Sequence, residues 1–410
     1  MKQLLTILSL LLCPGLMAAT ITVGKDQVIT SVRKAVAMAY DGDTILVHKG
    51  LYKEGNIVIN KSVRLIGIGG PVLDGEGKYE ILTVSAQGVL IKGITFANAG
   101  YSSVYDYAAI KVVDSDNIII ENNIVTNAYF AIHIANVTSG IVRNNRVRSN
   151  ATTEQGSGNG VHLWKCSEMV VEDNHLEGHR DGIYLEFVTH SIIQDNISIR
   201  NVRYGLHFMF SNDDAYMNNV FRDNGAGVAV MFSNRVLMHS NTFEHNWGSS
   251  AYGLLLKEIS DGRIIHNTFV QNTTAIHMEG ANRMEVQRNS FRNNGWAMRI
   301  QASSIDNTFF HNNFGGNTFD VATNGATAVN RYYNNYWDKY EGYDLDRNGV
   351  GDVPYHPVSM YSMIIEQNPT SLLLLRSFMV SLLDKAEKAL PSLTPENLVD
   401  DRPLMKPLHL

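Results

Sequence analysis

The sequence has almost no cysteine. Of the two cysteines in 410 residues, Cys13 lies in the N-terminal leader, which leaves Cys166 alone in the exported chain. A single thiol cannot form an intramolecular disulfide, although we expect the chain to reach an oxidising compartment. The fold is therefore predicted to contain no disulfide.

Basic residues are not in excess, and long apolar runs are missing as well. The 34 Lys and Arg are outnumbered by 40 Asp and Glu, which gives a net charge of −6. A nucleic-acid-binding chain needs clustered basic residues, so this class of protein is disfavoured. Because no apolar stretch of the exported chain reaches 18 residues, no membrane-spanning helix is predicted.

The first residues have the pattern of a secretory signal. Lys2 precedes an apolar run from Leu4 to Leu12, and the small residues Ala18 and Ala19 follow. This arrangement predicts cleavage near residue 19 and export of the remaining chain. A signal this short is typical of bacteria, so the expected compartment is the periplasm.

Asparagine recurs at a regular spacing over most of the chain. Successive copies lie 22 to 29 residues apart, most of them 22 or 23, and a usually apolar residue, often Phe, follows two positions later. A short alternating strand comes about ten residues further on in most copies, as in GVHLW, GLHFM and GVAVM. The recurring residues are Asn123, Asn145, Asn174, Asn196, Asn219, Asn241, Asn267, Asn289, Asn312 and Asn335.

This repeat predicts the fold class. The period is too short for paired-helix repeats, the strands alternate with period two, and Asn and Gly punctuate each strand. Leucine-rich repeats share the period but need a leucine consensus that is missing here. We therefore predict an all-β fold, a right-handed parallel β-helix of three sheets with 22–23 residues per coil. Its open ends need caps, and residues 29–40 predict an N-terminal capping helix.

The predicted organisation has four parts. Residues 1–19 form the signal peptide, residues 20–340 the β-helix, residues 341–357 a polar loop, and residues 358–410 a helical docking segment. An amphipathic helix is expected within the last part, at residues 371–390. Its apolar stripe either packs on the β-helix or docks on a membrane protein or the membrane surface. The stripe consists of Leu372, Leu375, Met379, Leu382 and Leu383.

Strand alternation predicts a metal site on the outer surface. In GLHFM, Leu206 and Phe208 face inward, so His207 and Met209 face outward. Met231 is the equivalent of Met209 on the next coil, about 4.8 Å away. Two thioethers and one imidazole suit Cu(I) better than Zn(II), so His207, Met209 and Met231 are the candidate copper ligands. The alternatives are an apolar patch for a partner protein, or a register shifted by one residue, which would bury both methionines.

Insertions lie near these residues. The long coils carry extra residues at 98–107, 149–158 and 245–252, and the last two flank the coils with the candidate copper ligands. A groove with walls at Glu154 and Trp247 is therefore predicted. The other outward histidines are expected to lie several coils apart in solvent.

A second metal site is predicted in the polar loop. Asp344, Asp346 and Asn348 occupy alternate positions and are followed by a glycine and by Asp352, as at the start of a calcium loop. The bidentate Glu that usually closes such a loop is absent. Structural calcium and a simple polar turn therefore both remain open. Further soft-metal candidates, each with core packing as the alternative, are Cys166, His356, Met360 and Met363.

Many parallel β-helices act on polysaccharides, which makes this class the main alternative function. Glycoside hydrolysis needs two carboxyl groups about 5–10 Å apart. On the predicted outer rows, Glu186 and Glu279 lie four coils apart, which is about 19 Å. The protein is therefore predicted not to be an enzyme. The alternatives are a polysaccharide-binding or -cleaving β-helix and a mechanical coupler whose methionines form a protein interface.

Several stretches resemble the NosD family over nearly the whole exported chain. They include DGIYLEF, GLHFMFSN, NNYWDKYEGYDLDRNGVGDVPYHP and the repeated NN-x-F coils. The resemblance implies a periplasmic β-helix that assists the maturation of nitrous oxide reductase. It implies work with an ABC transporter, made of a permease and an ATPase, and with a copper chaperone. The 371–390 helix would then dock on the permease, and the chain would meet the membrane only through that partner. Transient copper handling at the outer face follows as the expected function.

Overall fold

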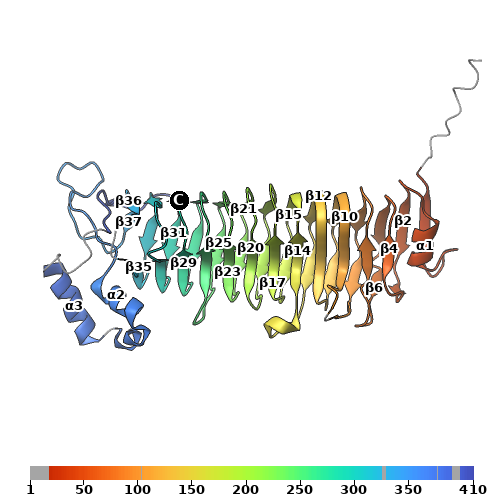
Figure 1. Ribbon diagram of the computed structural model, residues 1–410, viewed down its shortest axis with the longest axis horizontal. Helices are drawn as coiled ribbons and strands as arrows, with labels where there is room; N and C mark the ends of the chain where they lie inside the picture. Colours follow the sequence, from red (N-terminus) through yellow and green to blue (C-terminus); the bar gives the residue numbers. More distant parts are fainter. Residues whose placement is uncertain (1–17, 103, 326–328, 376, 390–397) are drawn as a thin grey trace, which may run out of the picture.

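The computed structural model forms an elongated solenoid of parallel strands with about 14 turns in its described part (Figure 1). The predicted all-β, parallel β-helical fold is thereby confirmed. Most of the predicted signal peptide lies outside the described residues. The structure describes residues 18–102, 104–325, 329–375, 377–389 and 398–410.

Each regular coil places one strand on each of three faces, which we call face 1, face 2 and face 3 in chain order. Face 1 contains β4 (Ile57–Ile59), β7 (Leu82–Val84), the first half of β10 (Ala108–Glu121) and of β12 (Phe130–Arg143), β14 (Asn159–Trp164), β17 (Asp181–Glu186), β20 (Tyr204–Met209), β23 (Ala226–Met231), β26 (Tyr252–Lys257), β29 (Thr274–Glu279), β32 (Trp296–Ile300) and β35 (Phe319–Thr323).

Face 2 continues each coil after a short corner. It contains β1 (Thr20–Val23), β2 (Thr44–His48), β5 (Arg64–Ile68), β8 (Leu90–Lys92), the second halves of β10 and β12, β15 (Ser167–Glu172), β18 (Ile192–Gln194), β21 (Ala215–Met217), β24 (Leu237–His239), β27 (Arg263–Ile265), β30 (Glu285–Gln287), β33 (Thr308–Phe310) and β36 (Arg331–Tyr333).

Face 3 closes the coil. It contains β3 (Leu51–Tyr52), β6 (Val72–Asp74), β9 (Thr95–Ala97), β11 (Ile124–Thr126), β13 (Arg146–Arg148), β16 (His175–Glu177), β19 (Ile197–Ile199), β22 (Val220–Arg222), β25 (Thr242–Glu244), β28 (Thr268–Val270), β31 (Ser290–Arg292), β34 (Asn313–Gly315) and β37 (Tyr336–Trp337).

The three faces form two hydrogen-bonded sheets in the described residues. Face 3 is a sheet of 13 strands, whereas faces 1 and 2 belong to one sheet of 24 strands. The two faces join because β10 and β12 each run around the corner as one 14-residue strand. At that corner Asp114 and Asn117 have positive φ, which bends the strand without interrupting its pairing.

The recurring asparagines form a ladder at the corner between faces 2 and 3. Each Nδ2 donates to Oδ1 of the asparagine on the next coil at 2.9–3.1 Å. The ladder residues from Asn123 to Asn335 are buried. Phenylalanines two positions later stack inside face 3, for example Phe291 on Phe314 at 4.7 Å between ring centroids. The 22–23-residue period therefore places like residues above one another, where amides bond and rings stack.

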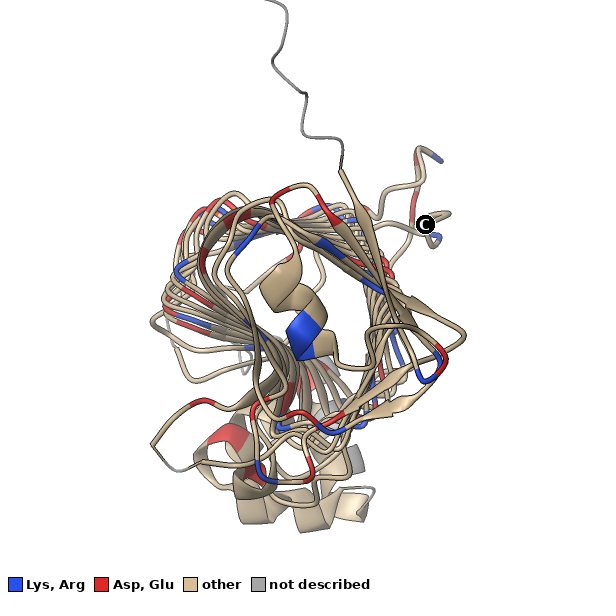
Figure 2. Cartoon of the chain, turned by 90° about the vertical axis from the view of Figure 1, so that its right-hand side faces the viewer, with Lys and Arg blue, Asp and Glu red and all other residues tan. Residues whose placement is uncertain are grey.

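Both ends of the core are covered. Helix α1 (Val32–Met38) is capped by the Ser31 side chain and buries Val32, Ala35 and Val36 against the first coils. Figure 2 shows it lying across the N-terminal end of the solenoid. At the other end, Asp400 of the C-terminal tail accepts hydrogen bonds from Asn335 Nδ2 and Trp337 Nε1, both at 3.0 Å. This carboxylate replaces the next asparagine of the ladder, a cap that the sequence analysis did not predict.

The C-terminal segment differs from the single helix predicted at residues 371–390. It forms α2 (Met360–Gln367), a 3-10 helix η2 (Pro369–Leu374) and α3 (Phe378–Ala389). These elements project from the side of the solenoid at its C-terminal end (Figure 1). Pro369 lies in the first turn of η2, and the residues of the predicted stripe are distributed over η2, α3 and the residues next to them.

Candidate functional site

The outer surface of face 1 carries the predicted site. The register aligns Glu186, Met209, Met231 and Lys257 in one row along β17, β20, β23 and β26. Met209 and Met231 are partly exposed, whereas the alternate residues Leu206, Phe208, Val228 and Val230 belong to the core. The methionines therefore lie on the outer side of adjacent strands, and the alternative of a shifted register is wrong.

His207 lies beside this pair but is only 4% exposed. The rings of Tyr184 and Tyr204 cover it at centroid distances of 4.9 and 4.8 Å. Its Nδ1 lies 3.6 Å from Oδ2 of Asp181, while its buried Nε2 has no hydrogen-bond partner among the described residues. One side of the imidazole therefore faces a carboxylate, and the other keeps an unused nitrogen.

Asp181 is itself buried and held by a bidentate pair. Arg203 donates from Nε to Oδ1 at 2.9 Å and from Nη2 to Oδ2 at 2.5 Å. Burial alone would raise the pKa of Asp181, but the contacts with His207 and Arg203 outweigh it and lower that pKa. The carboxylate is therefore ionised at neutral pH, and together with Arg203 it fixes the position of His207.

Asp181 and Arg203 could not be predicted from strand alternation, because the alternation fails at the start of this strand. Counting back from Leu206 places Tyr204 inside, yet its ring contacts the outward His207. Gly205 occupies the inward position instead, where a Cβ would lie 2.6 Å from the carbonyl oxygen of Gly227. Because this glycine faces inward, the residue before it faces outward, which adds a third row of outward side chains. A sequence rule that includes the glycine at the start of each strand would have predicted this row.

The expectation that the other outward histidines lie apart in solvent is wrong. His133 and His162 are register partners on β12 and β14, and their rings stack at 4.7 Å. Burial lowers the pKa of His133 to about 4 and that of His162 to about 3. With Tyr184 and His207 they form a continuous column of rings, which we call the imidazole row. The rings of Phe130 and Tyr204 lie beside the row and contribute to its burial.

Three phenylalanines border the methionines. Phe187, Phe210 and Phe232 follow Glu186, Met209 and Met231 in the chain, and their rings stack at 5.2 and 5.1 Å. They are 45%, 40% and 39% exposed and have positive φ. We call these three residues the phenylalanine ladder. The equivalent positions on the neighbouring coils are Lys165 and Glu258, so the exposed rings are confined to the coils with Glu186 and the methionines.

The insertions project from one side of the solenoid, as expected. Figure 1 shows the loop with η1 (Glu154–Gly156) and the loop before β26 pointing to the same side as α2 and α3. The charge of Glu154 acts on Arg203 and Tyr204, so η1 lies close to the buried pair behind His207. Trp247 is 65% exposed. A groove between Glu154 and Trp247 stays a prediction.

Helix α2 covers face 1 further along the solenoid. Arg299, in the same row as His207, forms an ion pair with Glu366 of α2 at 2.6 Å, and the Tyr361 ring contacts Phe319 at 5.9 Å. Val380 of α3 is buried in the same cluster, with Leu375 packed against it. A cavity of about 480 Å³ lies at the ends of β29, β32 and β35; it is lined by His277, Glu279, Gln301, Ala302, Ser303 and Asn324.

The predicted docking stripe is divided by this packing. Leu375 faces the cluster and Leu383 is half-buried, whereas Leu372, Met379 and Leu382 are exposed. Neighbouring Leu373 is 90% exposed. The segment therefore anchors through one group of apolar residues and presents another to the outside. Within the described residues, none of the helices has the length and apolar character needed to cross a membrane.

The remaining metal candidates have other roles. Asp344 and Asp346 accept hydrogen bonds from the backbone N–H groups of Asn348 and Gly349, and Asp352 accepts one from the N–H of Leu345. In the part of the chain that the structure describes, no group of three or more His, Cys, Asp or Glu is arranged to hold a metal ion. The polar turn therefore accounts for these residues, and calcium there has no support.

Cys166 and the second soft-metal group also lie away from the methionines. Cys166 is buried in the core, where burial raises the pKa of its thiol to about 11. Its Sγ donates to the carbonyl oxygens of Trp164 and Ile134, at 3.4 and 3.5 Å. Met363 packs against the core as well. These observations agree with an inert thiol and with core packing.

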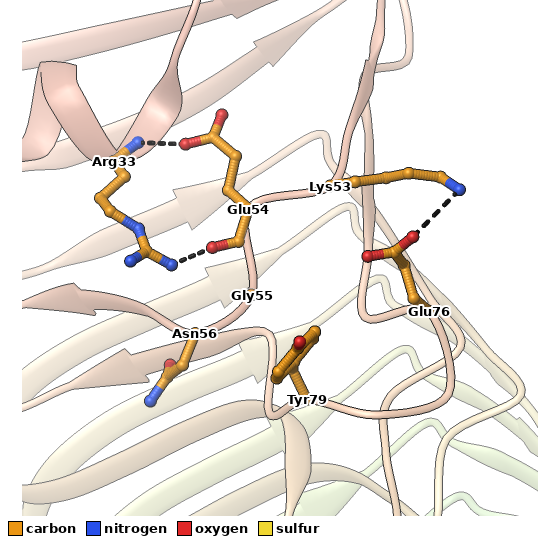
Figure 3. A pocket seen from close by; sticks show the side chains of 7 residues that line it. All are labelled: Arg33, Lys53, Glu54, Gly55, Asn56, Glu76 and Tyr79. Atoms are coloured by element: carbon orange, nitrogen blue, oxygen red, sulfur yellow. Dashed lines mark hydrogen bonds and ion pairs between the residues drawn. The ribbon is translucent and has the colours of Figure 1, made fainter.

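A separate cavity of about 520 Å³ lies at the N-terminal end (Figure 3). Its charged side chains are paired: Arg33 donates to the carbonyl oxygen of Glu54, and Lys53 lies 3.3 Å from Glu76. The Glu54 carboxylate in turn accepts from the N–H groups of Val32 and Arg33 at the start of α1. This cavity shares no residue with face 1, and its polar groups serve the N-terminal cap.

Comparison with known proteins supports the predicted resemblance. Residues 143–342 match the family described as "Periplasmic copper-binding protein (NosD)". The chain is 28% identical over 381 residues to "Probable ABC transporter binding protein NosD" of Pseudomonas aeruginosa, covering 86% of each chain. It is 27% identical over 374 residues to the protein of the same name from Stutzerimonas stutzeri, covering 86% of this chain and 85% of that one. The resemblance to NosD is therefore confirmed.

Solved structures share the fold at low identity. The catalytic unit of a thermostable GH87 α-1,3-glucanase from Streptomyces thermodiastaticus has a TM-score of 0.58 and 13% identity, covering 75% of this chain. This chain spans 62% of the length of that glucanase. PfbA, a surface adhesin of Streptococcus pneumoniae, has a TM-score of 0.56 and 13% identity, with 72% and 87% covered. At these identities the likeness shows the β-helical fold alone.

Proposed function

We propose that this chain is a periplasmic accessory protein of the NosD type that binds copper transiently on face 1. It docks through its C-terminal segment on the permease of an ABC transporter and takes part in assembling the copper centre of nitrous oxide reductase. It performs no catalysis of its own. The observation that carries this proposal is the position of Met209 and Met231 on adjacent strands, next to a buried histidine with a free ring nitrogen.

The ligand chemistry favours Cu(I). Thioether sulfur binds soft cations well, whereas Zn(II) and Ca(II) prefer thiolate, imidazole or oxygen ligands. The two methionines are partly exposed, so a copper ion can reach them from solvent or from a partner protein. Neutral sulfur ligands hold a cation without a large Coulombic attraction. Such a site suits a protein that must release its cargo again.

Asp181 supports this role for His207. Histidines that bind metals commonly donate their other ring N–H to a carboxylate, which fixes the tautomer and makes the free nitrogen a better ligand. Asp181 lies on the Nδ1 side of His207, and the partnerless atom is Nε2. Arg203 neutralises the carboxylate and keeps it in place. His207 is thus oriented to bind through Nε2.

The C-terminal segment supports docking at the same face. Its inner residues pack on β32 and β35, at the downstream end of the face that carries the methionines. Its outer residues, including Leu373 and Met379, are exposed apolar side chains of a kind that suits contact with a membrane protein. A permease bound there lies on the side of the solenoid from which η1 and the other insertions project (Figure 1). Copper donor, acceptor and transporter then share one face.

The copper chaperone and the reductase follow from the resemblance to NosD, and the phenylalanine ladder offers them a contact surface. Exposed stacked rings are unusual on a solenoid and are typical of protein interfaces. Because the ladder borders the methionines, a protein bound to it holds its own metal ligands beside them. Direct ligand exchange then moves copper without releasing the ion.

A polysaccharide-binding or -cleaving protein is the second candidate. It is favoured by the aromatic side chains of Tyr184, Tyr204 and Tyr252 on face 1. Cleavage also needs a pair of carboxyl groups at catalytic distance. Glu186 and Glu279 are four coils apart in the register, and Asp181 is already paired with Arg203. Copper handling therefore accounts for more of the face.

The test is an anaerobic Cu(I) titration against a chromophoric chelator, with X-ray absorption to identify the ligand atoms. We expect at least one Cu(I) per chain with sulfur ligands, and its affinity should fall at least 100-fold in Met209→Leu/Met231→Leu. Met217→Leu is the matched control, because Met217 is a partly exposed methionine of the same coil on face 2. Sulfur-bound copper that survives the double substitution would contradict the proposed site.

Docking is tested separately by co-purification with the permease and ATPase. Replacing Leu373 and Met379 by Asp places charge on the exposed apolar segment and should abolish association. Val28→Asp is the control, because Val28 is fully exposed at the opposite end of the solenoid. Association that persists after the double substitution would move the docking surface away from the C-terminal segment.

A further inference from the structure

The upstream part of the imidazole row contains buried nitrogen atoms without partners. Neither Nδ1 nor Nε2 of His162 has a hydrogen-bond partner among the described residues, and Nδ1 of His133 has none either. A neutral imidazole always carries one N–H donor, so His162 buries an unpaired donor in either tautomer. Buried polar atoms without partners are rare in folded proteins and often mark the place of an ion.

The surroundings of these two rings form an enclosed aromatic site. His133 and His162 stack at 4.7 Å with 28° between the ring planes. Phe130 lies 5.6 Å from His133 and 5.7 Å from His162, and Tyr184 lies 4.8 Å from His162 on the next coil. The two imidazoles are thus held between aromatic rings, on strands whose register fixes their spacing.

We propose that His133 and His162 form a second Cu(I) site, separate from His207, Met209 and Met231. The inference rests on the proposed function in taking copper as the cargo. Like atoms of stacked rings on adjacent strands lie about 4.8 Å apart. Two ligand nitrogens at about 2 Å from a shared metal lie at most about 4 Å apart, so the rings must rotate from the stacked arrangement until their in-plane lone pairs converge on the ion.

The charge state of the site selects a monovalent ion. The two imidazoles lie beside the rings of Phe130 and Tyr184, and a neutral imidazole offers one lone pair to a metal ion. Asp106 and Asp181 act on the rings through their charge, and among the described residues neither carboxylate is hydrogen-bonded to them. A divalent ion there would have no carboxylate ligand, whereas two neutral nitrogens can hold Cu(I).

His133 and His162 lie on face 1, upstream of the site with Met209 and Met231. The register runs from His133 to His162, Tyr184 and His207, so the second site lies two coils upstream of His207, or about 10 Å away. Copper bound by nitrogen at one site and copper bound by sulfur at the other can be distinguished by X-ray absorption spectroscopy. Face 1 then carries two copper-binding sites rather than one.

The experiment uses the purified chain, anaerobic Cu(I) titration and X-ray absorption on three variants. We expect two equivalents in the unaltered chain. His133→Phe/His162→Phe should lose the nitrogen-bound equivalent with an affinity loss of at least 100-fold, and keep the sulfur-bound one. Met209→Leu/Met231→Leu should show the reverse. His175→Phe is the control, because His175 is a partly exposed histidine on face 3.

Each outcome separates this site from the proposed function. Sulfur-bound copper that is unchanged by the His133/His162 substitutions, with no nitrogen-bound equivalent, overturns the second site and leaves the first. Nitrogen-bound copper that depends on these two histidines, without any sulfur-bound copper, supports the second site and overturns the methionine site. If the unaltered chain binds no copper, both the second site and the methionine site are overturned. Phenylalanine preserves the ring stack, and an unchanged circular dichroism spectrum verifies that the variant folds.

Discussion

The asparagine ladder and the imidazole row are built in the same way, but they differ in whether their buried polar atoms are hydrogen-bonded. Both consist of equivalent residues stacked from coil to coil by a register that the repeat length sets. In the ladder each amide donates to the next amide and to a backbone carbonyl. In the row the rings stack, but His162 keeps two buried nitrogens without partners among the described residues.

This difference distinguishes a structural column from one that is available for binding. A buried polar group whose hydrogen bonds are all made contributes to stability, and removing it leaves its partners unpaired. A buried polar group without partners costs stability, and removing it leaves nothing unpaired. The same substitution of a polar by an apolar side chain should therefore have opposite effects in the two columns.

The largest effect is expected in the middle of the ladder, from Asn219→Leu. Asn219 Nδ2 donates to Ile193 and Asn241, and its Oδ1 accepts from both the N–H and the Nδ2 of Asn196. Leucine leaves several of these buried groups unpaired, at about 1–3 kcal/mol each. We expect a loss of about 4 kcal/mol or more in the free energy of unfolding, measured by urea denaturation.

An exposed asparagine gives the control for this substitution. Asn60 is exposed and its φ is not in the left-handed region, so Asn60→Leu should change the free energy of unfolding by less than about 0.5 kcal/mol. Similar losses in both variants would mean that the ladder is no more important than any surface amide, and the comparison would fail.

Much of the fold could be predicted because each coil repeats the same local signals. The spacing from Asn219 to Asn241, the phenylalanine two residues later and the alternation in GLHFM each act within one coil, and stacking multiplies them. The Asp400 cap could not be predicted in this way. It comes from a tail about 65 residues beyond Asn335 in the chain, and no repeat indicates where that tail returns.

The site was predicted only in part for a similar reason. Alternation placed Met209 and Met231 correctly, because it follows from the strand itself. It missed Tyr204, since a glycine beside it changes the side to which the strand start points. It also missed that both ring nitrogens of His162 are buried beside Phe130 and Tyr184, which lie on other coils. Contacts between coils decide which outward residues remain exposed.

The next largest effect is a dependence on pH to which the imidazole row should contribute and the asparagine ladder should not. Burial lowers the pKa of His133 to about 4 and that of His162 to about 3, below the ordinary value of 6.5. Below pH 6.5 the unfolded chain therefore binds more protons, and stability falls as the pH falls towards these values. The loss can reach about 3 kcal/mol for each imidazole, because one pKa unit corresponds to about 1.4 kcal/mol.

Urea denaturation at pH 7, 5 and 4 measures this dependence. His133→Phe/His162→Phe should flatten the decline, whereas Asn219→Leu should lower stability equally at each pH, because amides do not titrate. Other buried groups also contribute: the pKa of His277 is lowered to about 4 and that of Asp214 raised to about 8, both by burial. The decisive quantity is therefore the difference in slope between the chain and its variant. An unchanged slope would show that the two rings are not buried in the neutral form.

The smallest effect is expected from His162→Phe at pH 7 without copper, and it completes the comparison. Phenylalanine keeps an aromatic ring between His133 and Tyr184 and removes two buried nitrogens that have no partners. The free energy of unfolding should stay constant or rise by up to about 1 kcal/mol, because the cost of an unpaired buried group is relieved. A loss of 2 kcal/mol or more would instead mean that His162 makes hydrogen bonds through ordered water, and the row would then be a structural column like the ladder. A neutral or stabilising result would leave the histidine without a structural reason at this position, so that its value to the protein must lie in what it binds.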